Sequence, residues 1–575
     1  MSRALHPARL KRPFLGPLIY AVAALAVFGG VLPVMGHSWI GLDADARAPV
    51  YWLNLVADAL RHGHDPLVSN AIQAPGGVNL MWNPSLVLPG ILLSPLTLLA
   101  GPYAAYDVVI IAAPVLSAWA AFAALRRLVR SSRAAWVGGL VYGFSPAILA
   151  ESLGHPQTSI AWFAPVVLLL VHEAVVRRRW PRWRVGTLLG VATAAELLTS
   201  EEMVLATAVV GGCAVAVCAL QHRQWVRGAA ARLGTVLAVG MGVAAALAAL
   251  PLAVQFLGPY RPSGRLVLGD VVVADAGALL VPASRQLLHL PALLADPWSL
   301  VTEDAGTYIG LPIMLLLLVA WQRLRRVSAA VRWAVPMTVV TTVLAMGPHL
   351  HIGGVTTPVP LPWILVDRVP LFEDFDPARL MVLTWLGIAV VVAVTVDHAL
   401  RRSGRQRRLR LALIAAALAT LLPGAVPVTA ATAPAYFTSA DAATIPAGDT
   451  VLIAPLTEGS GMRVLIWQIQ AGLRWRMPDG NAYGAGRTMF FTGSPLTDEL
   501  AALESGRPLD IAHLDVAPLR DDLGHLGVGT VIVAGGAHGQ QELDLMRRVL
   551  GPETYAGGGA VVWHGVAALL STRRS

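Results

Sequence analysis

Long apolar runs separated by short polar segments form the pattern of the first three quarters of the chain. A helix that crosses a bilayer needs about 20 apolar residues, with a range of roughly 17 to 25. The chain offers such runs at residues 14–36, 103–125, 134–150, 158–176, 185–200, 203–220, 233–257, 306–321, 333–347, 380–398 and 411–431. This pattern predicts a polytopic α-helical membrane protein with about 11 transmembrane helices.

Two further segments are predicted to lie at the membrane surface. The run 84–101 is apolar, but Pro89 and Pro95 interrupt it, and proline weakens a helix interior. We expect it to form an interfacial or re-entrant helix, because a crossing there would invert every later span. Residues 48–62 repeat apolar side chains at helical spacing, which is typical of an amphipathic helix. The first outer loop, about 37–102, is therefore predicted to be structured.

Arginine clusters between the runs orient the protein. Cytoplasmic loops of membrane proteins are enriched in Lys and Arg. With a cytoplasmic N-terminus, every cluster falls on the cytoplasmic side, and Glu173 and Asp397 are the only acids assigned there. The remaining acids lie in outer loops, at outer helix ends or in the C-terminal region, so polar chemistry is expected at the outer face. The clusters are 126–133, 177–184, 223–232, 323–332 and 401–410.

Composition supports a membrane protein and argues against a soluble domain and against a nucleic-acid-binding protein. The 575 residues are 56% hydrophobic and 13% charged, whereas soluble domains carry about 25% charged residues. The net charge of +9 does not indicate nucleic-acid binding, since the arginines sit in short clusters between apolar runs. Cys213 and Cys218 lie in one apolar run without metal-ligand spacing.

The pattern changes after about residue 432. Short apolar runs at 450–455, 530–536 and 560–565 alternate with helix-like segments at 497–505 and 540–550. Strands that alternate with helices indicate a small α/β domain. We expect a membrane domain over 1–431, with a long outer loop at about 258–305, and an extracytoplasmic α/β domain over 432–575.

The stretch "SWIGLDADARAPVYW" places Asp43 and Asp45 two residues apart at the start of the first outer loop. In an extended or turn segment, alternate side chains point the same way, so both carboxylates can face one divalent cation or one acceptor hydroxyl. The alternative is that an aspartate caps the helix that starts near Ala46, since Asp is a favoured N-cap residue. Both interpretations stay open on sequence alone.

Other polar residues at the predicted outer face are candidates for substrate binding. Glu151 and His155 end the third span, and Glu201 and Glu202 occupy the turn between the fifth and sixth spans. Ionisable residues in or near a membrane span indicate a functional site.

Arg379, at the outer start of the tenth span, is a candidate for binding a phosphate group. A guanidinium recognises phosphate through two parallel hydrogen bonds. Alternatively, Arg379 pairs with Asp374 or Asp376, or reaches the lipid headgroups.

Several phrases resemble the polytopic GT-C glycosyltransferases, and more narrowly a group of bacterial membrane proteins with this architecture and an outer C-terminal domain. They are "YWLNLVADALRHGHDPL", "APGGVNLMWNPS", "VGGLVYGFSPAILAESLGHPQ", "LLTSEE", "VPLFEDFDPARLMVLTWLG" and "LIWQIQAGLRWRMPDGNAYG". The resemblance implies a hexosyl- or pentosyltransferase of the bacterial inner (plasma) membrane. It would use a polyprenyl-phosphate sugar donor and a glycan or lipid-linked acceptor, in contact with membrane lipids. It also implies that Asp43 or Asp45 acts as general base or binds Mg²⁺ or Mn²⁺.

Two alternatives remain from different functional classes. A transporter or lipid flippase is expected to place polar groups near the bilayer midplane, often in repeated halves. This chain concentrates its polar groups at the outer face, and its second half does not echo the first. The other alternative is a non-catalytic envelope-assembly protein that keeps the architecture without the activity.

Overall fold

The computed structural model describes residues 15–41, 44–221, 223–262, 272–282, 285–289, 305–369, 372, 375–457, 460–485, 493–535 and 539–571. The chain forms two compact units. Unit 1 comprises Met1–Pro33, Val108–Leu247 and Val267–Pro427, and unit 2 comprises Val34–Asp107, Ala248–Leu266 and Val428–Ser575. The first outer loop and the C-terminal region thus belong to the same unit.

Unit 1 is helical, and its centre is α15. Fifteen residues of this 20-residue helix are buried, which explains its almost uninterrupted apolar sequence. It packs against α5 and α14, and the hydroxyl of Thr384 donates to that of Thr341 on α14 at 2.9 Å. The helices are α1 (Leu15–Phe28), α4 (Pro102–Leu125), α5 (Ser132–Gly143), α6 (Pro146–Glu151), α7 (Pro156–Ser159), α8 (Phe163–His172), α9 (Arg182–Leu197), α10 (Glu201–Gln221), α11 (Arg223–Leu257), α13 (Leu311–Leu324), α14 (Ala329–Ala345), α15 (Met381–Leu400) and α16 (Gly404–Ala419).

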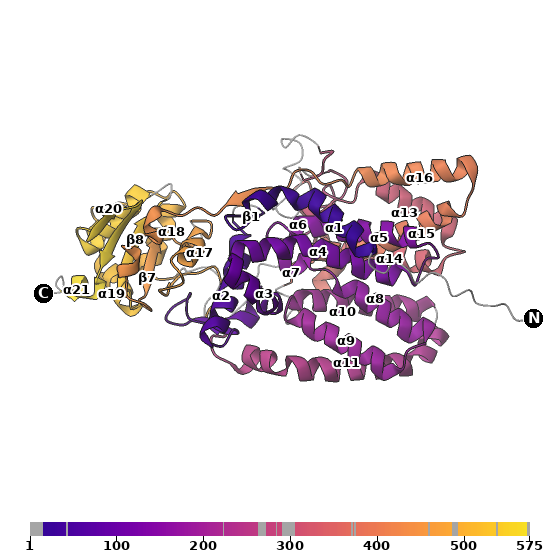
Figure 1. The fold of residues 1–575 in the computed structure, drawn as a ribbon, viewed down its shortest axis with the longest axis horizontal. Helices are drawn as coiled ribbons and strands as arrows, with labels where there is room; N and C mark the ends of the chain where they lie inside the picture. Colours follow the sequence, from indigo (N-terminus) through magenta and orange to yellow (C-terminus); the bar gives the residue numbers. More distant parts are fainter. Residues whose placement is uncertain are drawn as a thin grey trace, which may run out of the picture. The chain divides into compact units, whose positions relative to one another are not determined.

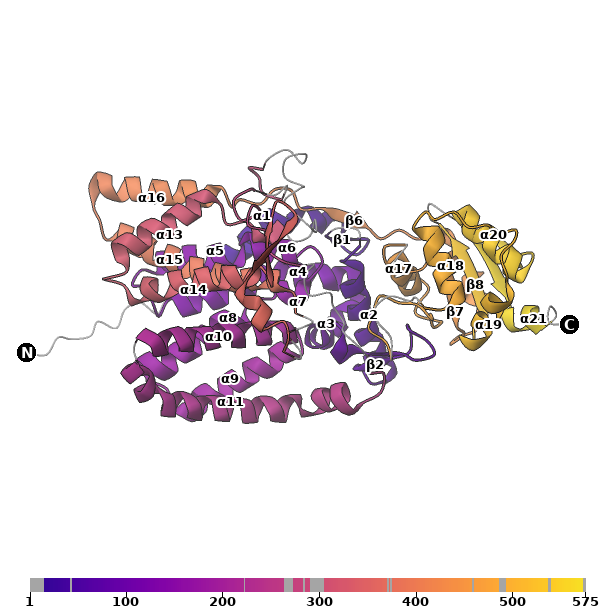
Figure 2. The same cartoon turned by 180° about the vertical axis from the view of Figure 1, so that it is seen from behind.

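Small residues allow two of these helices to approach closely. α9 and α11 run side by side in both ribbon views (Figures 1 and 2). A Cβ atom at Gly190 would lie 2.5 Å from the carbonyl oxygen of Gly240, and one at Gly186 would lie 2.7 Å from the Cβ of Val239. Close backbone approach at small residues is characteristic of helix packing in membranes.

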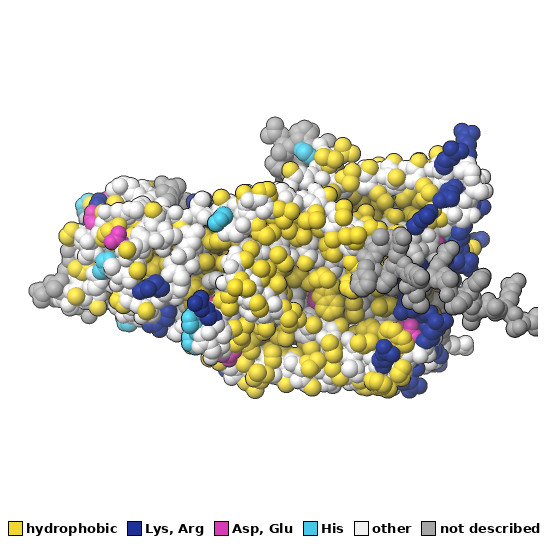
Figure 3. Space-filling view, viewed as in Figure 1, with side chains coloured by type: hydrophobic (Ala, Val, Ile, Leu, Met, Phe, Trp, Pro, Cys, Tyr) yellow, Lys and Arg dark blue, Asp and Glu magenta, His cyan; other side chains and the backbone are white. Residues whose placement is uncertain are grey.

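Within the described residues, six helices are long and apolar enough to cross a membrane. They are Pro17–Val34, Pro102–Leu125, Pro156–Arg177, Glu201–Ala219, Arg227–Leu257 and Pro377–Leu400, and three shorter apolar helices accompany them. Apolar side chains cover the helices of unit 1, and Lys and Arg side chains gather at the end where α15 passes into α16 (Figure 3). A multi-pass α-helical membrane protein is confirmed, whereas the number of eleven spans stays a prediction.

The described parts of the predicted long outer loop contain turns. Asp275 organises one part: its Oδ1 accepts a hydrogen bond from the amide of Gly277 at 2.7 Å, and its Oδ2 accepts one from the amide of Gly354 at 2.9 Å. Gly354 lies between β4 (His349–Ile352) and β5 (Val355–Pro360). Asp275 therefore ties residues 272–282 to this hairpin within unit 1.

Unit 2 contains the predicted C-terminal α/β fold. Its four-stranded sheet has the order β7-β8-β10-β9; β7 and β8 are parallel, and the other pairs are antiparallel. Every residue of β7 and β8 is buried, and helices cover the sheet (Figure 2). The elements are β6 (Val428–Ala430), β7 (Val451–Ala454), α17 (Arg463–Gln470), α18 (Pro495–Glu504), α19 (Ala517–His525), β8 (Thr530–Ala534), α20 (Gly539–Leu550), β9 (Tyr555–Gly557), β10 (Ala560–His564) and α21 (Val566–Ser571).

The first outer loop supplies the rest of unit 2. It contains β1 (Ser38–Ile40), α2 (Arg47–His62), β2 (Val68–Ser69), β3 (Val78–Asn79) and α3 (Val87–Ala100). α2 buries one face and ends at Gly63, whose φ of 70° lies in the left-handed region that glycine adopts without strain. β1 pairs with β6 in antiparallel register, with Trp39 opposite Thr429. The loop is therefore a folded part of unit 2.

Candidate active site

The acid-bearing turn lies between β1 and α2. Asp43 lies outside the described residues. Asp45 is partly buried, and its Oδ2 is buried without a hydrogen-bond partner in the described part of the chain. The N-cap residue of α2 is Ala46, and no side-chain hydrogen bond caps the helix there. The capping interpretation is thus not what the structure shows for Asp45.

A second carboxylate, which we did not predict, belongs to the same site. Asp107, near the start of α4, is 0% exposed, and its Oδ1 accepts a hydrogen bond from the amide of Ile40 at 2.8 Å. Its Oδ2 is buried and has no partner within the described ranges. The sequence did hold a signal, because an acid inside an apolar run is unusual and costly. The signal did not indicate that Asp107 meets the residue at the end of β1.

The hydroxyl of Tyr106 completes the group. This residue is 0% exposed, and its hydroxyl is buried with no hydrogen-bond partner among the residues described. The carboxylates of Asp107 and Asp45 both lie close enough to act on it electrostatically. A buried polar group without a partner costs about 1–3 kcal/mol. Three such oxygen atoms in one neighbourhood therefore indicate a place that binds a ligand with hydrogen-bond donors or positive charge.

Arg47 provides positive charge next to the acid-bearing turn. Its side chain is only 4% exposed, its guanidinium lies 5.9 Å from the ring centre of Trp39, and it donates to the carbonyl of Gly461. Trp39 stacks on Tyr103 at a centroid distance of 5.9 Å. Stacking holds the guanidinium in one orientation. The environment of Asp45 is thus aromatic and cationic as well as acidic.

Unit 1 gathers most of the predicted substrate-binding residues into a separate cluster. Arg379 pairs with Glu202 of α10, and its Nη2 lies 3.0 Å from Oδ2 of Asp376. The amide of Asp376 also donates to Glu202 at 3.2 Å. Of the alternatives for Arg379, pairing with Asp376 is observed, while Asp374 lies outside the described residues.

Glu151 and His155 belong to the same neighbourhood. Glu151 acts electrostatically on the Arg379 guanidinium, and His155 Nδ1 lies 3.7 Å from Glu151 Oε2. Glu201 is the first residue of α10 and directly precedes Glu202. The structure thus brings together residues from α6, from α10 and from the 3-10 turn Pro377–Leu380 that precedes α15, as expected for residues predicted to share one membrane face. It also shows that carboxylates already occupy the Arg379 guanidinium.

Metal ligands are few in the described part of the site. Within them, no group of three or more His, Cys, Asp or Glu side chains is placed to hold a metal ion. The unpartnered oxygen atoms of Asp45 and Asp107 are ligands of the kind that Mg²⁺ and Mn²⁺ prefer. Two carboxylates make an incomplete set, so the cation predicted at Asp43 and Asp45 stays a prediction.

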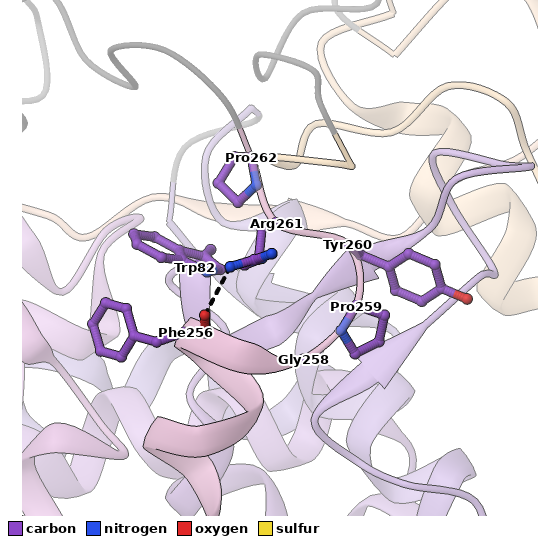
Figure 4. Close-up of a pocket in the computed structure, with 7 residues that line it drawn as sticks. All are labelled: Trp82, Phe256, Gly258, Pro259, Tyr260, Arg261 and Pro262. Carbon is purple, nitrogen blue, oxygen red and sulfur yellow. Dashed lines mark hydrogen bonds between the residues drawn. The ribbon is translucent and has the colours of Figure 1, made fainter.

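A cavity of about 570 Å³ lies elsewhere in unit 2, at the end of α11. Phe256 meets the ring of Trp82 edge-on at 5.5 Å, and Arg261 Nη1 donates to the carbonyl of Phe256 at 2.9 Å (Figure 4). Tyr260 points away from these two rings. Asn79 secures the same region by donating to the carbonyls of Val254 and Pro259. The "APGGVNLMWNPS" phrase therefore contributes Trp82 to the lining of this cavity, and Asn79 fixes the segment that supplies the rest.

Comparisons with known proteins identify the fold. No family model matches the chain, and no curated protein matches it by sequence. Among solved structures, it is similar to an oligosaccharyltransferase from Archaeoglobus fulgidus, with a TM-score of 0.51 and 12% identity over 91% of this chain and 70% of that one. It is similar to ArnT from Cupriavidus metallidurans bound to undecaprenyl phosphate, with a TM-score of 0.50 and 12% identity over 96% and 98% of the two chains.

A third similar structure is the arabinofuranosyltransferase AftD from mycobacteria. The TM-score is 0.54 and the identity 16%, over 92% of this chain but only 37% of AftD. All three neighbours are glycosyltransferases of the GT-C fold. The GT-C fold expected from the sequence phrases is thereby confirmed. At these identities the likeness establishes the fold alone.

Proposed function

We propose that the protein is an integral membrane glycosyltransferase that transfers a sugar from a polyprenyl-phosphate donor to an acceptor at the outer face of the membrane. The observation that carries the proposal is the set of buried, unpartnered oxygen atoms of Asp45, Tyr106 and Asp107 in a GT-C fold. A polyhydroxylated sugar or acceptor supplies the hydrogen-bond donors that these oxygen atoms lack.

The solved neighbours support this substrate class. ArnT was solved with undecaprenyl phosphate, and another structure of the Archaeoglobus enzyme holds a dolichol-phosphate and an inhibitory peptide. AftD is named as an arabinofuranosyltransferase. A hexose or pentose on a polyprenyl phosphate is therefore the proposed donor, and a cell-envelope glycan or lipid-linked glycan is the proposed acceptor. Because all three neighbours are transferases, they favour transfer over transport and over a purely structural role.

In the proposed reaction, Asp45 is the general base. As the acceptor oxygen attacks the anomeric carbon, the Asp45 carboxylate takes the hydroxyl proton, and the bond from that carbon to the phosphate oxygen breaks. The leaving polyprenyl phosphate keeps the electron pair. Asp43 remains the alternative base. The Arg47 guanidinium, fixed beside this turn, stabilises the negative charge that develops there.

The cluster around Arg379 in unit 1 is proposed to bind sugar hydroxyls, not the donor phosphate. A donor phosphate would have to compete with Glu202 and Asp376 for the Arg379 guanidinium. We therefore propose that Glu151, His155, Glu201, Glu202 and Arg379 shape the substrate-binding surface through hydrogen bonds to sugar hydroxyls. A divalent cation held by Asp43 and Asp45 would supply positive charge to the phosphate.

The proposal is tested with purified protein in lipid nanodiscs and a panel of polyprenyl-phosphate hexoses and pentoses, together with a membrane glycan extract. Transfer is expected with one donor, and Asp45→Asn is expected to lower kcat at least 100-fold. Asp58→Asn, at a partly exposed position in α2, is the matched control, and Asp43→Asn tests the alternative base. Unchanged transfer in Asp45→Asn would exclude this base, and no donor use in wild type would exclude the function.

A further inference from the structure

Residues from the C-terminal part of the chain hold the acid-bearing turn on both sides. Before the turn, β6 pairs with β1, and the hydroxyl of Thr429 donates to the carbonyl of Gly41 at 3.0 Å. After the turn, Arg47 donates to the carbonyl of Gly461. All these residues belong to unit 2. The turn that contains Asp45 is thus fixed by chain segments that follow it by almost 400 residues.

Gln468 of α17 fixes α2, the helix that follows the turn. Its Oε1 accepts a hydrogen bond from the hydroxyl of Tyr51 at 2.8 Å. Its Nε2 donates to the carbonyl of Ala71 at 3.0 Å and to that of Trp475 at 2.8 Å. Gln468 and Tyr51 are both 0% exposed. A buried amide with its oxygen and both its N–H groups bonded accepts only one geometry, so it specifies how α2 docks.

The rest of the loop is joined to the segment that follows α17. Nε2 of Gln73 donates to the carbonyls of Gly480 and Ala482 at 2.7 and 3.0 Å. Asn83 and Tyr483 exchange two hydrogen bonds: the Asn83 amide group donates to the Tyr483 carbonyl at 3.2 Å, and the Tyr483 amide donates to Asn83 Oδ1 at 2.8 Å. Most of these bonds are buried or partly buried. They form a continuous interface between residues 71–83 and 475–485.

We propose that the C-terminal domain is the positioning element of the acid-bearing turn, with Gln468 as the positioning residue that sets the place of α2 through Tyr51. α2 begins two residues after Asp45, so a displacement of this helix moves the base. A displacement of about 1 Å can cost a factor of 100 in rate. The consequence for catalysis rests on the proposed function, whereas the consequence for the position of the turn does not.

The test measures backbone hydrogen exchange in the full-length protein in nanodiscs. The variants are Tyr51→Phe, which removes one hydroxyl, Gln468→Met, which removes the amide at similar length, and the double variant. Gln540→Met on α20, at an exposed position, is the matched control. Loss of one or two buried hydrogen bonds is expected to speed amide exchange across residues 44–53 by about 5- to 30-fold. The double variant should exceed Gln468→Met by less than twofold, because both changes remove the same contact.

Exchange within twofold of wild type in both single variants overturns the positioning role. Equal acceleration in Gln540→Met overturns it too, because the effect would then be general destabilisation. Where transfer is measurable, kcat is expected to fall about tenfold while the KM for the donor stays within twofold; a change confined to KM would contradict positioning of the base. Wild-type protein without transfer activity would count against the proposed function alone, since the exchange result still decides the positioning role.

Discussion

The hydroxyl of Tyr51 on α2 donates a buried hydrogen bond of 2.8 Å to the side-chain oxygen of Gln468 on α17, a residue 417 positions further along the chain. The pair joins the first outer loop to the α/β fold of residues 451–571, and both belong to unit 2. Burial keeps the pKa of Tyr51 above its ordinary value, so the hydroxyl remains a donor over the whole working pH range. The contact is therefore not a pH-dependent one.

Gly480 lies close to Ile72 in the interface between residues 71–83 and 475–485, so a side chain at this position is expected to disturb the interface. Gly480 has a φ of 155°, and a Cβ atom there would lie 2.6 Å from the Cβ of Ile72. We expect Gly480→Ala to destabilise the docking of the loop by about 2 kcal/mol, because neither side can move easily. Thermal unfolding in detergent, with hydrogen exchange over residues 71–83, measures this effect.

At Gly524, a change from glycine to alanine is expected to raise the stability of the protein instead of lowering it. Gly524 lies in α19, and nothing stands within 4 Å of the Cβ that alanine would add. Gly524→Ala should stabilise the protein by about 0.5–1 kcal/mol through its higher helix propensity. If Gly480→Ala behaved like Gly524→Ala, the close contact with Ile72 would not exist in solution.

Asp107 is predicted to have two separable roles. Asp107→Asn keeps an oxygen that accepts from the Ile40 amide, so unfolding stability should change by less than about 0.5 kcal/mol. Its transfer activity should nevertheless fall about tenfold, because a carboxylate is lost at the site. Asp107→Leu leaves the Ile40 amide without its acceptor and should cost a further 1–3 kcal/mol of stability. Equal activity in Asp107→Asn and wild type would leave Asp107 a structural role only.

Removal of the Arg379 charge is expected to lower the stability of the protein strongly. Arg379→Met removes the cation from the partly buried carboxylate of Glu202 and the buried carboxylate of Asp376. Breaking a fully buried pair costs about 3–5 kcal/mol, and because the Arg379 and Glu202 side chains are 16% and 19% exposed, we expect a loss near the lower end of that range. Glu202→Gln in the same chain should recover part of the loss. Arg401→Met is the comparison, because Arg401 pairs with Asp397 but its side chain is 43% exposed. A loss no larger than that of Arg401→Met, measured by thermal unfolding, would contradict a buried pair.

Burial of Glu542 in α20 is expected to make the stability of the C-terminal region depend on pH. It is 1% exposed, and burial together with nearby Glu504 raises its pKa from 4.5 to about 7. The folded state therefore binds the proton more tightly than the unfolded state. Its stabilising contribution is complete below pH 4.5 and is lost as the pH rises through about 7. With allowance for solvent screening, the loss is about 2 kcal/mol by pH 8.

Thermal unfolding of two variants between pH 5 and 8 tests whether ionisation of Glu542 lowers stability. Glu542→Gln imitates the protonated acid, so the variant should be more stable than wild type at pH 8 and similar to it at pH 5. Glu553→Gln is the control: the partly exposed Glu553 pairs with Arg547, which lowers its pKa to about 2, so this substitution should leave the shape of the pH profile unchanged between pH 5 and 8. Identical pH profiles for wild type and Glu542→Gln would exclude a shifted Glu542.

Local pattern was enough to predict most of the helices, because length and apolar content are properties of a continuous segment. The predicted span 411–431 is an exception, since α16 covers Gly404–Ala419 and the strand β6 follows at Val428–Ala430. Local pattern was also less good where one apolar run makes two helices. The predicted span 134–150 breaks at Ser145, which caps α6 by accepting from the amide of Ile148, with Pro146 as the next residue. Serine followed by proline was visible in the sequence as a helix start, but continuous hydropathy outweighed it.

In the candidate site too, local features could be predicted from the sequence, whereas contacts between distant segments could not. Asp45 was identified because two acids follow an apolar run, a local signal. Its neighbourhood could not be predicted, since Asp107 meets Ile40 across 67 positions and Gln468 meets Ala71 across 397. Nothing in a single sequence specifies pairings at such separations. The unit 1 cluster was partly foreseeable, because the predicted orientation of the spans assigns its residues to one membrane face.

The pairing of β1 with β6 and of α2 with α17 sets the order in which the protein can be completed during synthesis. The chain grows at about 5–20 residues per second, so Gln468 emerges roughly 20–80 s after Tyr51. During that interval α2 lacks its docking partner, and β1 lacks its paired strand. A nascent or truncated chain that lacks α17 therefore holds Asp45 in a loop without these contacts, and the loop gains them only after the segments that follow it by about 400 residues have been made.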